Sequence, residues 1–413
     1  MIFYFNFVLH QHNRRMNIPN LACIAFVSLA VVSCGDSRKT SDTPDPLKIA
    51  FKVEPAPEWT ALFKRKHGWF GGDGIFAIPF SGNDSISDST LFIFSDTMVG
   101  EIKDDSLQPG YVMVNNSAMM LKGREPLDDR AEFLINTDKG QKPATLFTPA
   151  SSDIAKGDYY WLGDGFVNHA MDTSFLLFAY RIRNTNDGSP FPFREVGNNL
   201  IVIPKGSKFP YRDQKQYDLP FSKDGDSLYV SYGAGVLANT AAAGVEHPDE
   251  YIYVYGVRGK AKELLVSRVK ASQVTQFSAW QFYNGSDWNS SPSQARAVSD
   301  SVSNELSVTP IAGGRYALIY QYAGLMPTIY MQTGDSPVGP FGPRQKIWST
   351  SDDIKEKGLF TYNAKAHPAI SKPGELLVSY NVNSFDFFNQ IKKIPDLYRP
   401  RFVRIIFNSP VVQ

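Results

Sequence analysis

Short runs of strand-forming residues, separated by Gly, Asn, Asp, Ser and Pro, recur through most of this sequence and constrain its fold more than any other feature. Runs such as TLFIFS, FLLFAYRI, YIYVYGV, RYALIYQY and ELLVSYNV are rich in branched and aromatic residues, which suit the pleated surface of a sheet. No long apolar stripe of helical period interrupts them, and the segment DDIKEKGL has room for only one or two helical turns. The sequence therefore predicts an all-β fold.

These runs follow a longer rhythm, in which a polar or Gly-rich segment precedes a strongly apolar strand five times. The segments, here called heads, lie near residues 73, 164, 235, 305 and 367, so they are spaced 91, 71, 70 and 62 residues apart. A repeat of this length accommodates a four-stranded blade with its loops. We therefore predict a five-bladed β-propeller over residues 51–413. The alternative is a β-sandwich with accidental spacing.

Two segments between the heads support a blade architecture. LLVSRV is followed by FSAWQFYNGSDW, and TIYMQTGDSPVGPFGPRQKIW has a similar order of strand, turn and Trp-bearing strand. These segments resemble the blades of five-bladed propeller glycosidases, such as the arabinanase and xylosidase group of glycoside hydrolase family 43. The resemblance covers two blades and implies the fold more specifically than the reaction.

The heads supply polar side chains that a propeller would bring together. The innermost strand of each blade lines the central channel, so we expect Asp73, Asp164, Glu305 and His367 around one funnel, with only the small segment GAG from blade three. Cleavage of a glycosidic bond uses one carboxyl group as the acid and another as the base or nucleophile. For each acid alone the alternative is a turn residue, because Asp-Gly is a common turn sequence.

A further acid, Asp96, follows the strand TLFIF in the phrase LFIFSDTMVG, which leads to VNNSAMML. This order resembles the opening blade of bacterial propeller proteins, some of which are grouped as endo-D-arabinanases of glycoside hydrolase family 183. In that family the strand ends in Gly-Asp-Thr, whereas here Ser95 replaces the glycine. WFGGDG and YWLGDG resemble an uncharacterised branch found in Bacteroidetes lipoproteins. The resemblance implies the propeller fold and furanosidase chemistry.

We predict that Asp73 and one of Asp96 or Glu305 are the catalytic pair. Asp73 heads the first blade, where the resembling propeller class keeps a base or nucleophile, and the family 43 group uses Glu as its acid. If Asp73 and Asp96 are neighbours, their repulsion should raise one pKa and leave the other low. The alternative is that Asp96 accepts hydrogen bonds from backbone amides of the adjacent blade and braces the ring.

Other side chains beside the heads are candidates for substrate binding, with core packing, turns or solvated loops as the alternatives. They are Trp69, Asn116, Trp161, Asp164, Glu246, Tyr362 and His367. No cluster of Cys or His has metal-ligand spacing, so we predict no metal and no cofactor, although carboxylates with His367 leave a single Ca²⁺ in the channel as an alternative.

The N-terminus has the pattern of an export signal. Arg14 and Arg15 precede the apolar stretch LACIAFVSLAVV, and its end, VVSC, resembles a bacterial lipobox. This predicts a signal peptide over residues 1–33, a lipidated Cys34 and a flexible tether over residues 34–50. The alternatives are a plain signal peptide and a start at Met16. We expect a protein anchored to the bacterial cell envelope, most naturally at the outer membrane.

Composition narrows the choice of partner. The net charge is +1 and no basic stripe is present, which argues against nucleic acid. Aromatic residues make up 13% of the chain, a surplus that suits sugar-stacking surfaces as well as strands. Three hypotheses follow: a glycoside hydrolase acting on a polysaccharide, a surface glycan-binding lipoprotein without catalysis, and a scaffold lipoprotein.

Overall fold

The structure is a computed structural model that describes residues 47–86, 88–150, 154–185, 187–188, 192–222, 224–225 and 229–408. The predicted signal peptide, Cys34 and most of the predicted tether lie outside these residues. Within the described part of the chain, no helix is long and apolar enough to cross a membrane.

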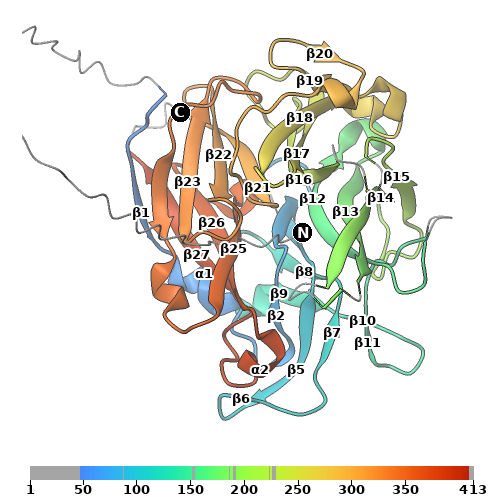
Figure 1. Ribbon diagram of the computed structural model, residues 1–413, viewed down its shortest axis with the longest axis vertical. Coiled ribbons are helices and arrows are strands. Elements are labelled where there is room, and N and C mark those ends of the chain that lie inside the picture. The colour runs from blue at the N-terminus through green and yellow to red at the C-terminus, as the bar shows by residue number, and fades with distance from the viewer. Residues whose placement is uncertain are drawn as a thin grey trace, which may run out of the picture. The chain divides into compact units, whose positions relative to one another are not determined.

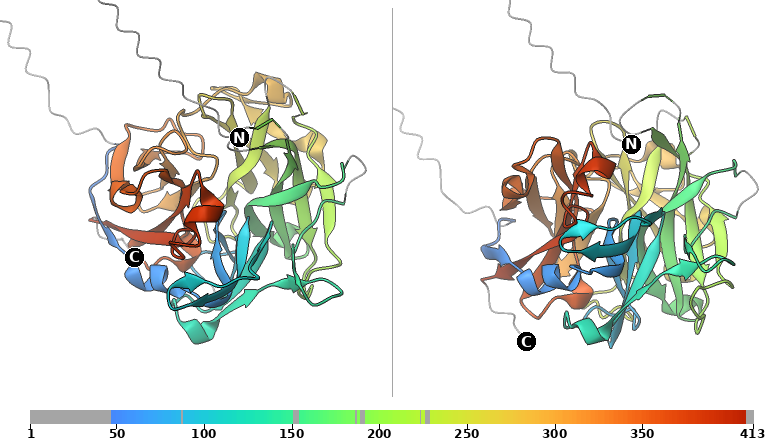
Figure 2. Two further views of the ribbon diagram at one scale, coloured as in Figure 1. Left: turned by 60° about the horizontal axis from the view of Figure 1, so that its bottom comes forward. Right: turned by 90° about the horizontal axis from the view of Figure 1, so that it is seen from below.

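Five antiparallel sheets form the blades of a propeller, grouped around their innermost strands (Figures 1 and 2). With the innermost strand first, the blades are β3-β4-β8-β9, β12-β13-β14-β15, β16-β17-β18-β19-β20, β21-β22-β23-β24 and β25-β26-β27-β1. Innermost strands of consecutive blades lie against one another. The predicted all-β, five-bladed propeller is therefore confirmed.

The strands of each blade follow the expected runs. Blade one comprises β3 (Phe76–Pro79), β4 (Ser89–Phe94), β8 (Ser117–Lys122) and β9 (Ala131–Leu134). Blade two comprises β12 (Tyr159–Asn168), β13 (Ser174–Asn184), β14 (Phe193–Ile203) and β15 (Lys215–Asp218). Blade three comprises β16 (Val230–Asn239), β17 (Tyr251–Arg258), β18 (Glu263–Lys270), β19 (Gln281–Tyr283) and β20 (Trp288–Asn289). Blade four comprises β21 (Leu306–Ile311), β22 (Arg315–Gln321), β23 (Thr328–Gly334) and β24 (Gln345–Ser349). Blade five comprises β25 (Leu359–Ala366), β26 (Glu375–Ser384), β27 (Pro400–Phe407) and β1 (Phe51–Pro55).

Further elements decorate the blades. A small sheet beside blade one contains β2 (His67–Gly72), β5 (Thr97–Lys103), β6 (Ser106–Leu107) and β7 (Val112–Val114). A two-stranded ribbon contains β10 (Asn136–Thr137) and β11 (Pro143–Ala144). Within the residues that the structure describes, the two α-helices are short, α1 (Pro57–Leu62) and α2 (Phe387–Gln390). DDIKEKGL, where the sequence allowed a helical turn, contains the end of a 3₁₀ turn over Ser351–Ile354.

The ring is closed by pairing the first strand with the last. β1 forms the outer strand of blade five, with Phe51 opposite Phe407 in an antiparallel ladder. Just before it, the Ile49 amide donates to Gln345 at 3.2 Å, and the Gln345 side chain donates back to the Ile49 carbonyl at 2.9 Å. Ile49, which belongs to the predicted tether, is therefore bonded to blade four.

A backbone irregularity recurs in the innermost strands. The pairing register shifts between Leu162 and Gly165 in β12, between Tyr232 and Gly235 in β16, and between Tyr362 and Lys365 in β25. A bulge bends a strand and re-aims the side chains of its extra residues. The heads of blades two and three are therefore parts of the innermost strands, the head of blade five lies at the end of β25, and Glu305 stands directly before β21.

Apolar side chains fill the space between neighbouring blades. Ile78 and Ile93 of blade one share a buried cluster with Leu177 and Ile201 of blade two. Burial of such side chains contributes roughly 1.5–3 kcal/mol each relative to exposure. The rigid packing between blades fixes the positions of the polar groups at the inner ends.

Candidate active site

Asp73 lies in the short connection between β2 and β3, where glycines allow close backbone approach. Its amide donates to the Asp96 carbonyl at 3.2 Å, and its own carbonyl accepts from the Ser95 amide at 2.8 Å. Gly71 has no room for a side chain, because a Cβ there would lie 2.6 Å from the Tyr398 carbonyl oxygen. Gly74 has φ +61, the left-handed region that favours glycine. The glycines of the sequence GGDG thus allow Asp73 to lie close to the backbone of both blade one and blade five.

Two tyrosines from blade five hold the Asp73 carboxylate. The Tyr362 hydroxyl donates to Oδ2 at 2.6 Å and receives a hydrogen bond from Asn383 at 3.2 Å. Oδ1 is buried and has no hydrogen-bond partner among the described residues. Burial raises the pKa of Asp73, while hydrogen bonds from Tyr362 and Tyr398 and the charge of Lys365 lower it. Asp73 is a half-buried acid, and of its two carboxylate oxygens only Oδ2 accepts a hydrogen bond from a described residue.

Asp96 lies close enough to Asp73 for the charge of Asp73 to raise its pKa. Asn115 donates to its Oδ1 at 3.3 Å. The indole N–H of Trp161 favours the ionised form, although it does not reach hydrogen-bond geometry. Burial, and then the charge of Asp73, raise the pKa of Asp96 to about 7. The prediction that only one of the two pKa values rises is wrong, because burial raises both.

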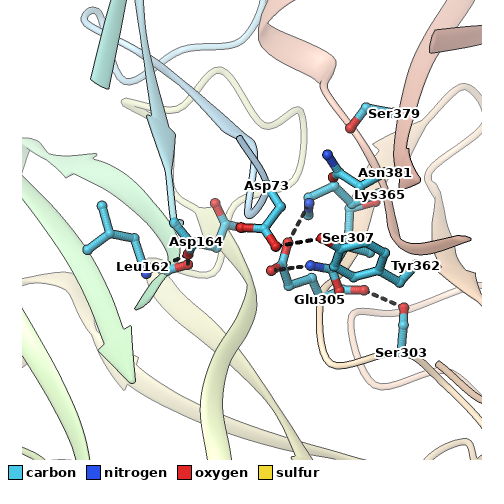
Figure 3. Close-up of polar contacts among 12 residues, drawn as sticks. Asp73, Leu162, Asp164, Ser303, Glu305, Ser307, Tyr362, Lys365, Ser379 and Asn381 are labelled. Atoms are coloured by element: carbon cyan, nitrogen blue, oxygen red, sulfur yellow. Dashed lines mark hydrogen bonds and ion pairs between the residues drawn. The ribbon is translucent and has the colours of Figure 1, made fainter. Parts of the chain in front are cut away.

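Glu305 enters the same region from blade four and forms an ion pair. Lys365 Nζ lies 2.5 Å from Oε2, and the Asn363 amide donates to Oε1 at 2.7 Å. The Lys365–Glu305 contact meets the distance of an ion pair but not the angle of a hydrogen bond. Lys365 is fully buried and also lies 4.5 Å from the centre of the Phe76 ring. Figure 3 shows Asp73, Glu305 and Lys365 pointing toward one another.

The pKa of Glu305 reflects these opposed influences. Burial raises it to about 7, the charge and contact of Lys365 lower it, and the charge of Asp73 raises it. Asp73 therefore interacts with both Asp96 and Glu305. The structure brings together the three acids that the sequence singled out as catalytic candidates.

Asp164 is engaged differently. Its Oδ1 accepts from the Gly165 amide at 2.8 Å, and its Oδ2 accepts from the Val236 amide of blade three at 2.7 Å. Burial raises its pKa to about 7 against these two hydrogen bonds, and the charge of Lys365 also lowers it. Asp164 thus bridges blades two and three. We call Asp73, Asp96, Asp164 and Glu305 the acid cluster.

Four of the predicted substrate-binding residues do not point toward this cluster, where a bound ligand would touch them. Trp69 is 1% exposed and packs in the core, where the centres of its ring and the Phe133 ring are 4.8 Å apart. Asn116 is fully buried and bonds the Phe147 and Tyr160 backbone. Glu246 has a side chain that is 83% exposed on a blade-three loop. The surroundings of these three residues match the alternatives named for them, which were core packing, turns and solvated loops.

The fourth of these residues is His367. It follows the end of β25, and its ring is 1% exposed. Its Nε2 lies 2.7 Å from the Ser379 hydroxyl, and its ring centre lies 5.8 Å from that of Phe402. Burial lowers its pKa well below the usual value, so the ring is neutral. His367 is a structural residue of blade five, whereas Trp161 and Tyr362 lie beside the acids.

Sequence reasoning missed Lys365 and Tyr398. Lys365 stands in the fifth head, two residues before His367, and a lysine inside a short buried strand was the available signal. Tyr398 precedes β27 and reaches Asp73 only through the closure of the ring, which no local pattern reveals. Among the residues that the structure describes, no three His, Cys, Asp or Glu side chains are placed to hold a metal ion.

A groove on the surface lies elsewhere. It has a volume of about 330 Å³ and is lined mainly by apolar residues of α1, β27 and neighbouring strands, including Trp348, Tyr380 and Phe402. None of the acid cluster lines it. Titratable groups with displaced pKa values locate functional sites on physical grounds, because catalysis requires such groups. We therefore place the candidate site at the acid cluster rather than in this groove.

Comparison with known proteins agrees with the fold. The family model described as a domain of unknown function, DUF5005, matches residues 57–408. A Bacteroides ovatus ATCC 8483 protein provisionally named a hydrolase has a TM-score of 0.66 at 21% identity, covering 86% of this chain and 90% of its own. At that identity the likeness shows the fold alone. No curated protein gives a significant match.

Weaker likenesses extend to glycosidases. An exo-β-1,3-galactanase from Phanerochaete chrysosporium has a TM-score of 0.45 at 11% identity, covering 82% of this chain and 62% of its own. An α-L-arabinofuranosidase from Clostridium thermocellum ATCC 27405 has a TM-score of 0.41 at 12% identity, covering 79% and 86%. Both TM-scores are below 0.5, so the functional argument rests on the site itself.

Proposed function

We propose that this chain, which belongs to the DUF5005 family, is a glycoside hydrolase that cleaves a polysaccharide or oligosaccharide at the acid cluster. One observation carries the proposal: Asp73 interacts with two acids, the half-buried Asp96 and the buried Glu305, each with a pKa near neutrality. Glycoside hydrolysis requires one protonated and one ionised carboxyl group at the same site. Neighbouring acids with displaced pKa values meet that requirement.

Asp73 is the base or nucleophile in this proposal. The Tyr362 hydroxyl at 2.6 Å, the Tyr398 hydroxyl and the Lys365 charge all favour its ionised form. Its Oδ1 is buried and has no hydrogen bond to a described residue, and we assign it as the oxygen that acts on the water molecule or the anomeric carbon. A buried acceptor without a partner is costly, and such groups are tolerated where they act.

Asp96 is the better proton donor of the two remaining acids. It has no ion-pair partner among the described residues, and the charge of Asp73 keeps its proton in place. Glu305 instead lies 2.5 Å from the Lys365 ammonium, which favours a carboxylate. We assign Asp96 as the general acid and Glu305, with Lys365, as the pair that sets the local charge.

The acid then protonates the leaving oxygen of the glycosidic bond while Asp73 activates water or attacks the anomeric carbon. Both stereochemical routes fit this division of roles, and the anomer of the first product distinguishes them. A furanoside substrate is one option, supported by the resemblance of the first blade to arabinanases. Galactans and xylans are further options that the test below includes.

A non-catalytic glycan-binding protein is the alternative function. It is favoured by the protein partners of Glu305 and Asp164, which satisfy these acids without any substrate. A binder retains affinity for a glycan and releases no sugar from it. The two functions are therefore separated by product formation alone.

Export and lipid anchoring at Cys34 are part of the proposal. They are supported by VVSC after an apolar run and by the polar segment that follows. Cys34→Ser should move the protein from the membrane fraction to the soluble fraction of the cell envelope. An unchanged membrane fraction would contradict the anchor.

The test of the hydrolase is incubation of the purified full chain with arabinan, β-1,3-galactan and xylan, followed by analysis of released sugars. We expect release from at least one polymer, and no release by Asp73→Asn, which keeps the shape of the side chain and removes its charge. Retention of the protein on a polymer without release of sugars would favour the glycan-binding alternative.

A further inference from the structure

The two tyrosines that reach Asp73 each begin a row of aromatic rings. Tyr362 stands on β25, and Tyr398 stands in the segment before β27. The Tyr362 hydroxyl donates to the Asp73 carboxylate at 2.6 Å. Tyr398 lies beside Asp73, where its carbonyl accepts from the Gly72 amide at 2.8 Å and its hydroxyl lowers the pKa of Asp73. The aromatic rings packed behind each tyrosine therefore connect Asp73 to the protein surface.

The first row runs through blade five to the surface. The ring centres of Tyr362 and Phe360 are 5.5 Å apart, and those of Phe360 and Phe385 are 4.7 Å apart. Phe360 is buried, whereas Phe385 is 51% exposed. This row thus ends in a large apolar side chain that stands half in solvent.

The second row ends three residues further along the chain. The ring centres of Tyr398 and Phe387 are 4.8 Å apart, and those of Phe387 and Phe388 are 5.2 Å apart. Phe388 is 53% exposed. Phe385 precedes α2 and Phe388 lies within it, so both rows end on one short segment (Figure 1).

We propose that Phe385 and Phe388 form an aromatic ledge that docks the continuing sugar chain of a polymeric glycan whose cleavage occurs at Asp73. The proposal rests on the proposed function and adds a substrate class, a polymer rather than a short oligosaccharide. The observation that supports the proposal is that both aromatic rows begin beside Asp73 and end at exposed rings.

The chemistry of the segment suits a sugar more than a wholly apolar partner. Exposed Asp386 and Asn389 stand between and beside the two rings, with Asn389 donating to Asp386 at 2.9 Å. A sugar ring presents C–H groups on its faces and hydroxyl groups at its edges. Aromatic rings cover the faces, and carboxylate and amide groups bond the edges. Half-exposed large aromatics beside a site commonly mark a binding surface.

The experiment compares chain lengths in the full-length protein. The double variant Phe385→Ala/Phe388→Ala is measured on arabinan, β-1,3-galactan and xylan and on the trisaccharide of each. Loss of two stacking contacts should lower kcat/KM on the cleaved polymer roughly tenfold and on the trisaccharide by at most about threefold. The matched control is Phe80→Ala, a phenylalanine that is 36% exposed just after β3, at the far end of that innermost strand.

A second measurement tests the aromatic ledge independently of whether the protein is a hydrolase. Electrophoresis in gels containing each polymer measures retardation without cleavage. Retardation of the wild-type chain and of Asp73→Asn, lost in the double variant, supports the ledge even if no sugar is released. Equal losses on polymer and trisaccharide, unchanged polymer kinetics, or no retardation of any form would each overturn the ledge.

Discussion

Asp73 and Asp164 occupy corresponding places in blades one and two, yet their surroundings differ. Both oxygens of Asp164 accept backbone amide hydrogens, at 2.8 and 2.7 Å, and tie two blades together. Asp73 accepts from the Tyr362 side chain at Oδ2 and leaves Oδ1 without a partner among the described residues. The position of an acid in the repeat does not show whether it braces two blades or reacts with a substrate. The hydrogen-bond partners of its two carboxylate oxygens do.

The same contrast separates Asp96 from Glu305. Both have a pKa of about 7 because of burial. Glu305 has a cation at 2.5 Å, while Asp96 has a neutral amide at 3.3 Å. Equal pKa values thus arise from unequal surroundings, and the acid without a cation is the better proton donor.

The largest expected effect comes from removing the proposed proton donor. Asp96→Asn should lower kcat on the natural glycan by roughly 10²–10⁴-fold, the usual contribution of a general acid. On a nitrophenyl glycoside the loss should be much smaller, since that leaving group departs without a proton. Steady-state kinetics on both substrates provides the measurement.

Glu305→Gln is the matched control for this result. If Glu305 sets the local charge, its loss should be similar on both substrates, because leaving-group protonation is not its role. A leaving-group dependence in Glu305→Gln, and none in Asp96→Asn, would exchange the two assignments.

The ion pair should matter strongly for stability. Lys365→Met leaves Glu305 buried without its cation, and removing one partner of a buried pair costs about 3–5 kcal/mol. Urea unfolding should therefore show a free energy of unfolding lower by that amount. The double variant Lys365→Met/Glu305→Gln should recover part of the loss, and a double variant as unstable as the single one would contradict the pairing.

Stability should also depend on pH in an unusual direction. The folded pKa values of Asp96, Asp164 and Glu305 are about 7, above the unfolded values near 4. Their contribution is fully present below pH 4 and is lost as the pH rises through 7, because the folded state then holds charges that burial disfavours. Acids with lowered pKa values, such as Asp158 and Asp300, act oppositely at low pH.

Unfolding measured between pH 4 and 8 should therefore give greatest stability on the acid side of neutrality. A fall of at least about 1.4 kcal/mol toward pH 8 corresponds to one pKa unit of one group. Asp96→Asn should flatten the decline. Stability that rises steadily from pH 4 to 8 would show that these acids are ionised without penalty.

The smallest effect concerns the tyrosine that holds Asp73. The Tyr362 hydrogen bond lowers the pKa of Asp73, so Tyr362→Phe should raise it. The acid limb of the pH–rate profile should then move upward, by about one unit for a loss of about 1.4 kcal/mol. Tyr253→Phe, which removes a hydroxyl bonded to Asp249 on blade three, is the control and should leave the limb in place.

The blades were predictable because they repeat. The spacing of the heads and the apolar second strands revealed the five-fold architecture before any contact was known. Closure was not predictable, because β1 is only five residues long and pairs with a strand some 350 residues away. Local patterns carry no information about such a partner.

The site was predictable in part for the same reason. Asp73 and Glu305 mark heads, and Asp96 ends a strand, so their residue types and places were visible. Lys365, Tyr398 and the burial of Trp69 and His367 depend on contacts across blades. Such contacts follow from three-dimensional packing, which a single sequence does not display.

The most direct test compares Asp73→Asn with Asp164→Asn, in one series, for turnover and for the free energy of unfolding. The account predicts opposite patterns. Asp73→Asn should lose at least about 10³-fold in kcat with stability largely kept. Asp164→Asn should lose about 1–3 kcal/mol of stability, through its weakened bridge to Val236, and keep turnover within about tenfold. Near-normal cleavage by Asp73→Asn, or the same pattern in both variants, would contradict the account.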